Sequence, residues 1–209
     1  MPIVLKLDNP KGQCVSVWKT TETLEDLLQK TKLSDEERVT MNSFSNESRK
    51  REWLAVRTLL QSLRPFCPTI KYKDNGKPYL ADGSEEISIS HSGPYIAIAL
   101  TKIGTPGVDI EQVHPKIKRI AERFVNEKEK AFIKEDTLIE QLCLLWCAKE
   151  VLYKIHPKGM LSFKNNLLVS PFILSDTGQM EGTINVNNSS SVHKLSYHKI
   201  DNCMLVYTD

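Results

Sequence analysis

The sequence predicts an α+β protein built from two subdomains. In both halves of the 209-residue chain, helical patterns fall between groups of strand-like segments, which is typical of α+β units. The turn-rich stretch 101–106 is the best boundary between the halves. We therefore expect an N-terminal subdomain over 1–104 and a C-terminal subdomain over 105–209.

Turn residues and capping signals define the first elements. Two strands are predicted over 2–7 and 14–19, with the turn residues of 8–12 between them. A short helix is expected over 22–30. Another helix begins near Ser34, because Ser-Asp-Glu-Glu has the form of a capping box.

The strongest helical pattern of the chain runs from about Ser45 to Leu63. Its apolar side chains recur at helical spacing, at Trp53, Val56, Leu60 and Leu63. The prolines of segment 64–68 end it. Farther on, alternating residues and the turn at 92–94 predict a hairpin over 87–101.

The C-terminal half is expected to hold helices and then strands. Two helices are predicted over about 115–135 and 136–155. The last fifty residues should form three or four antiparallel strands, with turns at 175–178, 187–191 and 201–202.

Composition is that of a soluble globular protein, with 40% apolar and 26% charged residues. The net charge of +2 does not argue for nucleic acid or membrane binding. No run approaches the roughly 18 apolar residues of a membrane span. The first eight residues are too short and too charged for a signal peptide. We expect a cytoplasmic protein.

Cysteine usage agrees with a reducing compartment. The five cysteines are scattered, odd in number and form no Cys-x-x-Cys pair: Cys14, Cys67, Cys143, Cys147 and Cys203. The pair 143 and 147 shares a helical face and could bind metal, but we interpret both residues as small core side chains.

Two acidic residues in a predicted strand are the first candidates for a functional site. In Gly107-Val108-Asp109-Ile110-Glu111, residues two apart project from one face, so Asp109 and Glu111 can point at one spot while Val108 and Ile110 face the core. Gly107 would let another chain or a ligand approach closely. Taken alone, two acids at this spacing are also typical of a solvated strand face.

A predicted helix supplies a third carboxylate and an ammonium group. Glu150 and Lys154 lie four residues apart and share a helical face, and Trp146 would anchor that helix. Taken alone this is an ordinary surface pair. Converging with Asp109 and Glu111, these groups would suit a hard divalent cation and a phosphate-bearing ligand. An enzyme is therefore the leading interpretation.

Further candidates lie in the N-terminal half. Ser90 and His91 sit at a predicted strand end, where function tends to collect, and Lys77 lies in a turn. One of the basic residues of the long helix could clamp a phosphate. The chain has no Gly-rich phosphate loop, no His-Glu-x-x-His motif and no Gly-x-Ser-x-Gly elbow.

Taken in order, these segments resemble the 4′-phosphopantetheinyl transferases of the larger, single-chain (Sfp-type) class. The matching segments are Arg57-Thr58-Leu59-Leu60, Gly76-Lys77-Pro78-Tyr79-Leu80, Ile89-Ser90-His91-Ser92-Gly93, Gly107-Val108-Asp109-Ile110-Glu111, Arg123-Phe124 with Glu129, and Trp146-Cys147-Ala148-Lys149-Glu150 with Lys154. Each is short, but their order and spacing match across about 57–154. The resemblance fades before residue 45 and after about 163.

The resemblance implies a fold and a reaction. Such enzymes have two similar α/β subdomains related by a pseudo-two-fold axis, with the active site in the cleft between them. They transfer the 4′-phosphopantetheine arm of coenzyme A to a serine of an apo acyl, peptidyl or aryl carrier protein. The reaction depends on magnesium and releases 3′,5′-ADP.

By the family's pattern, Asp109, Glu111 and Glu150 would hold Mg²⁺ together with the pyrophosphate of coenzyme A, the second substrate. Lys154 would pair with the phosphates. Attack on a pyrophosphate needs charge neutralisation, which a metal and a lysine supply. We expect Glu150 to act as the general base toward the serine, directly or through a metal-bound water.

The resemblance also implies contacts for the nucleotide end of coenzyme A. Lys77, Ser90 and His91 would contact it, and Arg57 would meet its 3′-phosphate. Related enzymes carry basic residues ahead of the long helix, where this chain has Glu36-Glu37-Arg38. The adenine end would then be held differently.

Smaller departures concern two positions: Val151 stands where a small residue is usual, and Glu129 matches an acidic position of the family. The acceptor should be an acidic carrier protein that presents a helix. Basic residues after the metal strand could meet it, at Lys116, Lys118, Arg119 and Arg123, although a solvated helix face explains them equally well. We expect a monomer that binds neither nucleic acid nor membrane.

Two alternatives remain open at this point. One is a different magnesium-dependent phosphoryl-transfer or hydrolytic enzyme that uses the same carboxylates. The other is a non-catalytic module that binds coenzyme A or a carrier protein. Three acids facing a pyrophosphate argue against a mere binding module.

Overall fold

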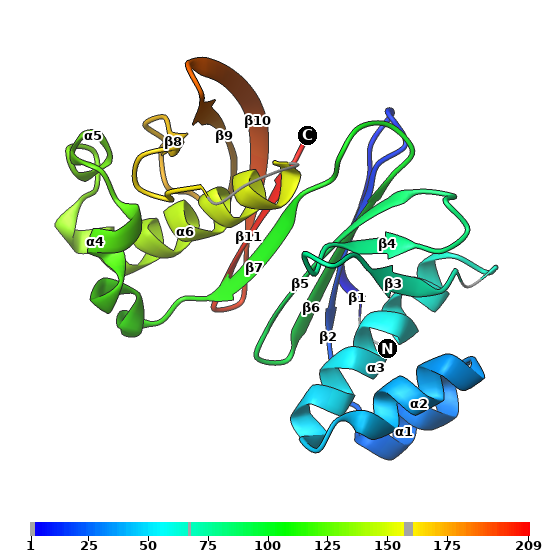
Figure 1. Ribbon diagram of the computed structural model, residues 1–209. Helices are drawn as coiled ribbons and strands as arrows, with labels where there is room; N and C mark the ends of the chain where they lie inside the picture. The colour runs from blue at the N-terminus through cyan, green and yellow to red at the C-terminus, as the bar shows by residue number, and fades with distance from the viewer. Residues whose placement is uncertain (1–2, 67, 157–160) are drawn as a thin grey trace. The chain divides into compact units, whose positions relative to one another are not determined.

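The computed structural model describes residues 3–66, 68–156 and 161–209, so Cys67 lies outside the described part (Figure 1). The chain forms two compact units, Met1–Gly104 and Thr105–Asp209, divided at the position where the sequence places the boundary. Each unit mixes helices and strands. The predicted α+β class is confirmed.

The N-terminal unit is built on a four-stranded antiparallel sheet. Its strands are β1 (Ile3–Asp8), β2 (Cys14–Lys19), β5 (Glu86–Ser92) and β6 (Tyr95–Thr101). They pair in the order β1-β2-β6-β5. The two predicted strands and the predicted hairpin are therefore confirmed. Every residue of β6 is buried, which places this strand in the core of the unit.

Three capped helices accompany this sheet: α1 (Leu24–Lys30), α2 (Asp35–Ser43) and α3 (Glu47–Leu63). The capping box predicted at Ser34 is present, because its side chain accepts from the backbone N–H of Glu37 while the Glu37 side chain accepts from Ser34. Helix α3 packs on β6 and buries its residues from Trp53 to Leu60.

A small hairpin beside this sheet was missed in the sequence. Strands β3 (Ile70–Tyr72) and β4 (Pro78–Leu80) pair around the turn predicted at 74–78. Gly76 adopts a φ of 80° there, a conformation that glycine reaches without steric cost. Strands of three residues carry too short a pattern to be recognised by alternation.

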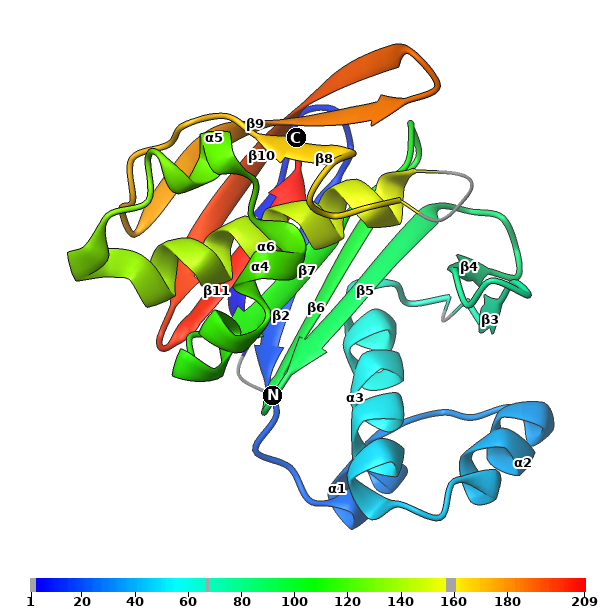
Figure 2. The same cartoon turned by 60° about the vertical axis from the view of Figure 1, so that its left-hand side comes forward.

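The C-terminal unit consists of a five-stranded antiparallel sheet and one long helix, α6 (Leu138–Ile155). The sheet order is β7-β11-β10-β9-β8, with β7 (Val108–Gln112), β8 (Leu167–Val169), β9 (Thr177–Val186), β10 (Ser189–Ile200) and β11 (Cys203–Thr208). Helix α6 packs on β7 and β11 (Figure 2). The apolar side chains between helix and sheet form the core of this unit.

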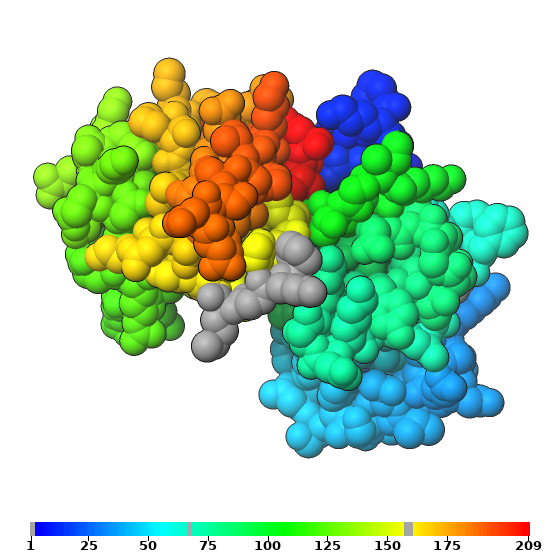
Figure 3. All heavy atoms as spheres, turned by 45° about the horizontal axis from the view of Figure 1, so that its top comes forward, coloured from blue at the N-terminus to red at the C-terminus, as the bar shows by residue number. Residues whose placement is uncertain are grey.

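The turn between β9 and β10 is shorter than predicted. Asn187 and Asn188 have φ values of 48° and 62°, and Ser189 already pairs with Val186. Two central residues with positive φ make the tight hairpin turn that suits the twist of paired strands, and asparagine tolerates it. The β9–β10 hairpin, orange in Figure 3, lies on the surface of its unit.

The prediction of one helix over 115–135 is wrong. The segment forms short separate turns instead: η1 (Pro115–Arg119), α4 (Ala121–Phe124), α5 (Glu127–Lys130) and η2 (Glu135–Thr137). The break follows α4, where Asn126 starts a new capping box with Glu129. Side chains that cap a new turn compete with continuation of the preceding helix. None of the described helices is long and apolar enough to cross a membrane.

Candidate active site

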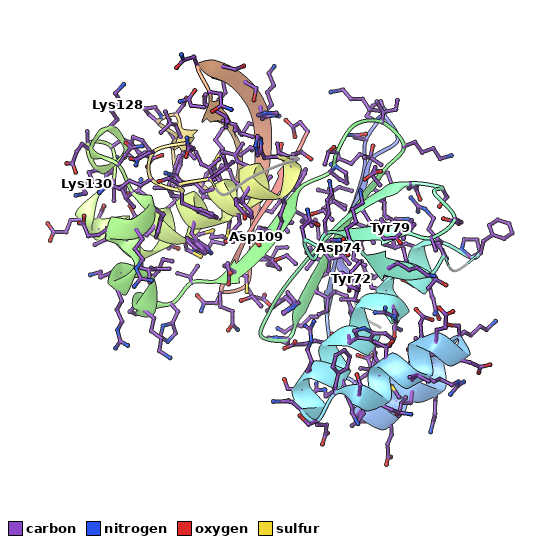
Figure 4. The ribbon with its side chains drawn as sticks, viewed as in Figure 1. Tyr72, Asp74, Tyr79, Asp109, Lys128 and Lys130 are labelled. Atoms are coloured by element: carbon purple, nitrogen blue, oxygen red, sulfur yellow. The ribbon has the colours of Figure 1, made fainter. Side chains whose placement is uncertain are left out.

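Strand β7 carries the first two predicted carboxylates. Val108 and Ile110 are fully buried, as the alternation predicts. Asp109 is buried as well, with only 3% of its surface exposed, whereas Glu111 is half-buried. Figure 4 labels Asp109 on this strand. The aspartate therefore lies inside the protein and not on an open strand face.

Lys154 joins the last turn of α6 to β7. Its Nζ atom donates to Oδ1 of Asp109 and to the carbonyl oxygen of Val108, both at 2.8 Å. About a quarter of the lysine side chain is exposed, against 4% of the aspartate side chain. The buried carboxylate therefore has an ammonium beside it that still reaches solvent.

Gly107 makes this close approach of helix and strand possible. A Cβ atom at this position would lie 2.8 Å from side-chain methyl carbons of both Val151 and Ile155, and 3.1 Å from the carbonyl oxygen of Val151. These distances are shorter than normal carbon contacts, so any larger residue would push α6 away. The sequence predicted a close approach at Gly107, and the approaching chain is the helix that carries Glu150 and Lys154.

Burial and the charges of the other predicted residues shift the pKa of Glu150. Burial first, and then the negative charges of Asp109 and Glu111, raise its pKa from 4.5 to about 7, although the ammonium of Lys154 lowers it. The three carboxyl groups and the ammonium of Lys154 therefore share one electrostatic environment. A carboxyl group with a pKa near 7 is able to exchange a proton at neutral pH.

These carboxylates do not form a closed metal cage. Among the described residues, no three or more His, Cys, Asp or Glu side chains lie close enough together to hold a metal ion. Like charges repel, and Lys154 already stands beside Asp109. Mg²⁺ commonly binds through one or two carboxylates, waters and substrate phosphates, so this donor chemistry fits Mg²⁺. The set of three protein ligands remains a prediction.

In the N-terminal unit, the hairpin β5–β6 presents two of the predicted nucleotide contacts. Ser90 is buried, whereas 39% of the His91 side chain is exposed and its Nε2 lies 4.0 Å from Oε2 of Glu52. His91 lines a pocket of about 180 Å³ together with Tyr72 and Gly76. Figure 4 shows Tyr72 and Tyr79 on the small hairpin β3–β4.

Lys77 follows Gly76 in the turn of that small hairpin. Its backbone N–H donates to Oδ1 of Asn75. Its neighbours Gly76 and Pro78 line the pocket that His91 also lines. The structure therefore brings the turn of Lys77 and the strand of His91 to one pocket.

Arg51 is a residue that the sequence did not single out. It lines a pocket of about 320 Å³ next to Gly93 and Pro94, in the turn that follows His91. Its Nε atom is buried and has no hydrogen-bond partner within the described part of the chain. The sequence showed only a helix with four basic residues, and helical spacing alone does not say which of them faces a pocket.

Arg57 is buried in the interior of its own unit. Its Nε donates to Oε1 of Glu37 at 2.9 Å, and its other nitrogens donate to the carbonyl oxygens of Trp53 and Ile70. The guanidinium also stacks on the Trp53 ring, 3.2 Å from the centroid. A contact with the 3′-phosphate, as expected from the sequence, would have to displace these partners. The structure gives that expectation no support.

The four described cysteines, Cys14, Cys143, Cys147 and Cys203, are all buried. Burial raises the pKa of Cys147 well above its ordinary value, which keeps the thiol protonated. The Sγ atoms of Cys143 and Cys147 face backbone carbonyl oxygens of β7 and β11. These thiols pack as core side chains, as the sequence suggested.

Comparisons with known proteins point to one superfamily. Residues 105–202, nearly the whole C-terminal unit, match the model of the 4′-phosphopantetheinyl transferase superfamily. The C-terminal unit is therefore similar to this superfamily.

Three relatives illustrate the match. The chain is 31% identical over 112 residues to the 4′-phosphopantetheinyl transferase AcpT of Salmonella typhimurium, covering 51% of this chain and 58% of that protein. It is 32% identical to AcpT of Escherichia coli K12, with 51% and 57% covered. A putative 4′-phosphopantetheinyl transferase of Synechocystis is 27% identical over 151 residues, with 65% and 61% covered. The matched region thus spans less than two thirds of each relative.

Proposed function

We propose that this protein transfers the 4′-phosphopantetheine arm of coenzyme A to the serine of an apo acyl, peptidyl or aryl carrier protein. The observation that carries the proposal is the shared electrostatic environment of Glu150, Asp109, Glu111 and Lys154, inside the unit that matches the superfamily. Transfer from a pyrophosphate requires a base and positive charge near the phosphates; Glu150 can act as the base, Lys154 carries positive charge, and the carboxylates could hold a metal ion.

In the proposed reaction, the serine oxygen attacks the phosphorus that carries the pantetheine arm. A new P–O bond forms, the bond to the bridging pyrophosphate oxygen breaks, and 3′,5′-ADP leaves. The serine proton passes to Glu150, a carboxyl group whose pKa burial and the neighbouring carboxylates raise to about 7 in the metal-free protein. The ammonium of Lys154 offsets the negative charge of the transferred group.

Asp109, Glu111 and Glu150 are the residues that would hold Mg²⁺. When bound, the metal ion would supply charge neutralisation on the pyrophosphate. Lys154 would then be shared between Asp109 and the phosphates of coenzyme A. Two carboxylates suffice for such a site, because waters and phosphate oxygens complete the coordination of Mg²⁺.

The nucleotide end of coenzyme A is proposed to contact the N-terminal unit through Lys77, Ser90 and His91. The pocket that His91 lines supports this assignment. We add Arg51, since its guanidinium lines the neighbouring pocket and can pair with a phosphate. Arg57 is left out because Glu37 and two carbonyl groups already use its donors.

We also propose that the chain belongs to the single-chain, Sfp-type class, with two related units that both contribute to coenzyme binding. Each unit packs one long helix on an antiparallel sheet, α3 with 17 residues and α6 with 18. The sheets differ in size and order, so the relation would be that of diverged repeats. A cytoplasmic monomer remains our expectation.

The acceptor is proposed to be an acidic carrier protein that docks on η1 and α4. This segment carries Lys116, Lys118, Arg119 and Arg123. Beside Lys118 lies a pocket of about 420 Å³ whose apolar lining includes Val125, Ile133 and Leu142. An acidic helix with an apolar side chain would match both the charge and the pocket. The α5 residues Lys128 and Lys130 lie in the same part of the unit (Figure 4).

Intact-mass analysis of an apo carrier protein tests the proposal. Incubation with this protein, coenzyme A and Mg²⁺ should add one phosphopantetheine arm, and EDTA or Glu150→Ala should abolish the gain. Hydrolysis of coenzyme A without transfer would favour a different magnesium-dependent enzyme. Binding of coenzyme A without any chemistry, across several carrier proteins, would favour a binding module.

A further inference from the structure

Lys149, the residue before Glu150, is a charged side chain held in the interior of the C-terminal unit. It is fully buried, and its Nζ donates to Oε2 of Glu129 at 2.7 Å. It also donates to the carbonyl oxygens of Phe124 at 2.5 Å and Phe163 at 2.8 Å. An ammonium has three protons, so all of its donors find acceptors.

Glu129 is equally well satisfied. Only 1% of its surface is exposed. Its Oε1 accepts from the backbone N–H of Val169, and its Oε2 from the backbone N–H of Asn126, both at 3.0 Å. The pair therefore connects α6 to the end of α4, to α5 and to β8.

Phe163 packs against the same ridge of the helix. The ring of Phe163 stacks on Trp146 at 5.2 Å and lies 5.4 Å from the ring of Tyr153. Trp146 and Tyr153 are seven residues apart and flank Lys149 on one face of α6. Hydrogen bonds to Lys149 and ring packing thus hold this ridge together.

A helix held on one ridge cannot turn freely about its axis. Glu150 lies on the ridge next to Lys149, on the side of Lys154 and Asp109. A small rotation of α6 would move the Glu150 carboxyl group relative to the carboxylates of β7. Apolar packing alone restricts such rotation less sharply than directed hydrogen bonds do.

We propose that the buried Lys149–Glu129 pair is a positioning device, which sets the rotation of α6 and thereby places Glu150 against Asp109 and Glu111. This inference rests on the proposed function. An apolar pair of the same volume would stabilise the fold about as well, because burying two charges is costly. The orientation that its hydrogen bonds impose on α6 therefore explains why the Lys149–Glu129 pair is charged.

The double variant Lys149→Met/Glu129→Gln tests this inference. It removes the ion pair but leaves one side-chain oxygen, which can still accept from the N–H group of Val169 or from that of Asn126. The measurements are Mn²⁺ binding by electron paramagnetic resonance, urea unfolding, and the kcat and KM values for coenzyme A. We expect a folded protein with Mn²⁺ affinity and kcat each reduced about 10- to 100-fold, and with KM changed less than about threefold.

A partly buried ion pair in the other unit supplies a control. Arg64 and Glu85 of the N-terminal unit form a bidentate ion pair, with Nη2 2.7 Å from Oε1. The variant Arg64→Met/Glu85→Gln should lower the free energy of unfolding while leaving Mn²⁺ affinity and kcat close to wild type. Comparison of the two double variants therefore separates the effect of lower stability from the effect of a misplaced Glu150.

The outcomes distinguish this inference from the proposed function. Lys149→Met/Glu129→Gln with wild-type Mn²⁺ affinity and kcat would overturn it. Should the double variant not fold, Glu129→Gln alone decides, because it retains both carbonyl contacts of Lys149 and should show the same losses to a smaller degree. A wild-type protein that neither binds Mn²⁺ nor transfers the arm would refute the proposed function and this inference together.

Discussion

The Nζ atom of Lys154 lies 2.8 Å from Oδ1 of Asp109, so the last turn of α6 neutralises a carboxylate that β7 buries. This contact places a positive charge where the sequence predicts a divalent cation. It also depends on Gly107, which alone lets helix and strand approach so closely. Stability and proposed catalysis are therefore coupled at this point of the C-terminal unit.

Lys154→Met should lower the free energy of unfolding by about 2 to 4 kcal/mol, because it leaves the buried carboxylate of Asp109 without its ammonium. In Asp109→Asn/Lys154→Met both charges are gone, and the loss should be smaller than the sum of the two single losses. Urea unfolding in EDTA measures all three variants. Strict additivity would show that the two residues do not interact.

The metal-free protein should lose stability between about pH 4.5 and pH 7. Burial and the neighbouring carboxylates raise the pKa of Glu150 from 4.5 to about 7. In this window the folded state holds a proton that the unfolded state has lost, so the stabilisation is complete below pH 4.5 and disappears as pH rises through 7. The effect amounts to about 3 kcal/mol at most.

Urea unfolding at a series of pH values in EDTA measures this dependence. Glu150→Gln carries no titratable proton and should flatten the profile over the same window, while Glu122→Gln, at an exposed glutamate, should leave it unchanged. An unchanged slope in Glu150→Gln would contradict the assigned cause.

Gly107→Ala should destabilise the C-terminal unit by about 1 to 3 kcal/mol and reduce transfer, because the new methyl group collides with Val151 and Ile155. Adding Val151→Ala removes one of these contacts and should recover part of the loss. Thermal unfolding and the transfer assay follow both variants. An alanine tolerated at no cost would show that α6 shifts easily, which would argue against a tightly set position of Lys154.

Lys118→Glu/Arg119→Glu should raise the KM for the carrier protein about tenfold and leave the KM for coenzyme A unchanged. Charges at the edge of a docking surface mainly affect encounter, so the difference from wild type should shrink as salt is added. Lys11→Glu/Lys102→Glu makes the same change in net charge at exposed positions of the other unit. Equal effects of both double variants would point to overall charge and not to a docking site.

Elements with local signals were predictable from the sequence. The capping box at Ser34 and the alternating pattern of the hairpin over 87–101 are signals formed by residues close together in the chain. The structure has both elements where they were expected. The prediction of one helix over 115–135 was wrong because another local signal was overlooked. The averaged pattern of this segment is helical, but Asn126 and Glu129 form a local cap that restarts the chain within it.

The candidate site residues also differ in how far local spacing could predict their placement. Spacing alone was enough to bring Asp109 with Glu111, and Glu150 with Lys154, to common faces of a strand and a helix. Spacing could not show that Arg57 is buried against Trp53, or that Arg51 lines a pocket. A basic residue on a helix looks the same in the sequence whether it faces solvent, a ligand or a buried acceptor.

By itself, the sequence determined the α+β class, most of the element order and the residues that carry the proposed chemistry, because these depend on neighbours within a few positions. Only the tertiary structure decided which charges pair. Lys149 meets Glu129 across 20 residues, and Lys154 meets Asp109 across 45. Such pairs form because packing brings distant segments together and excludes water from them, and no local pattern records which buried charge will find which partner.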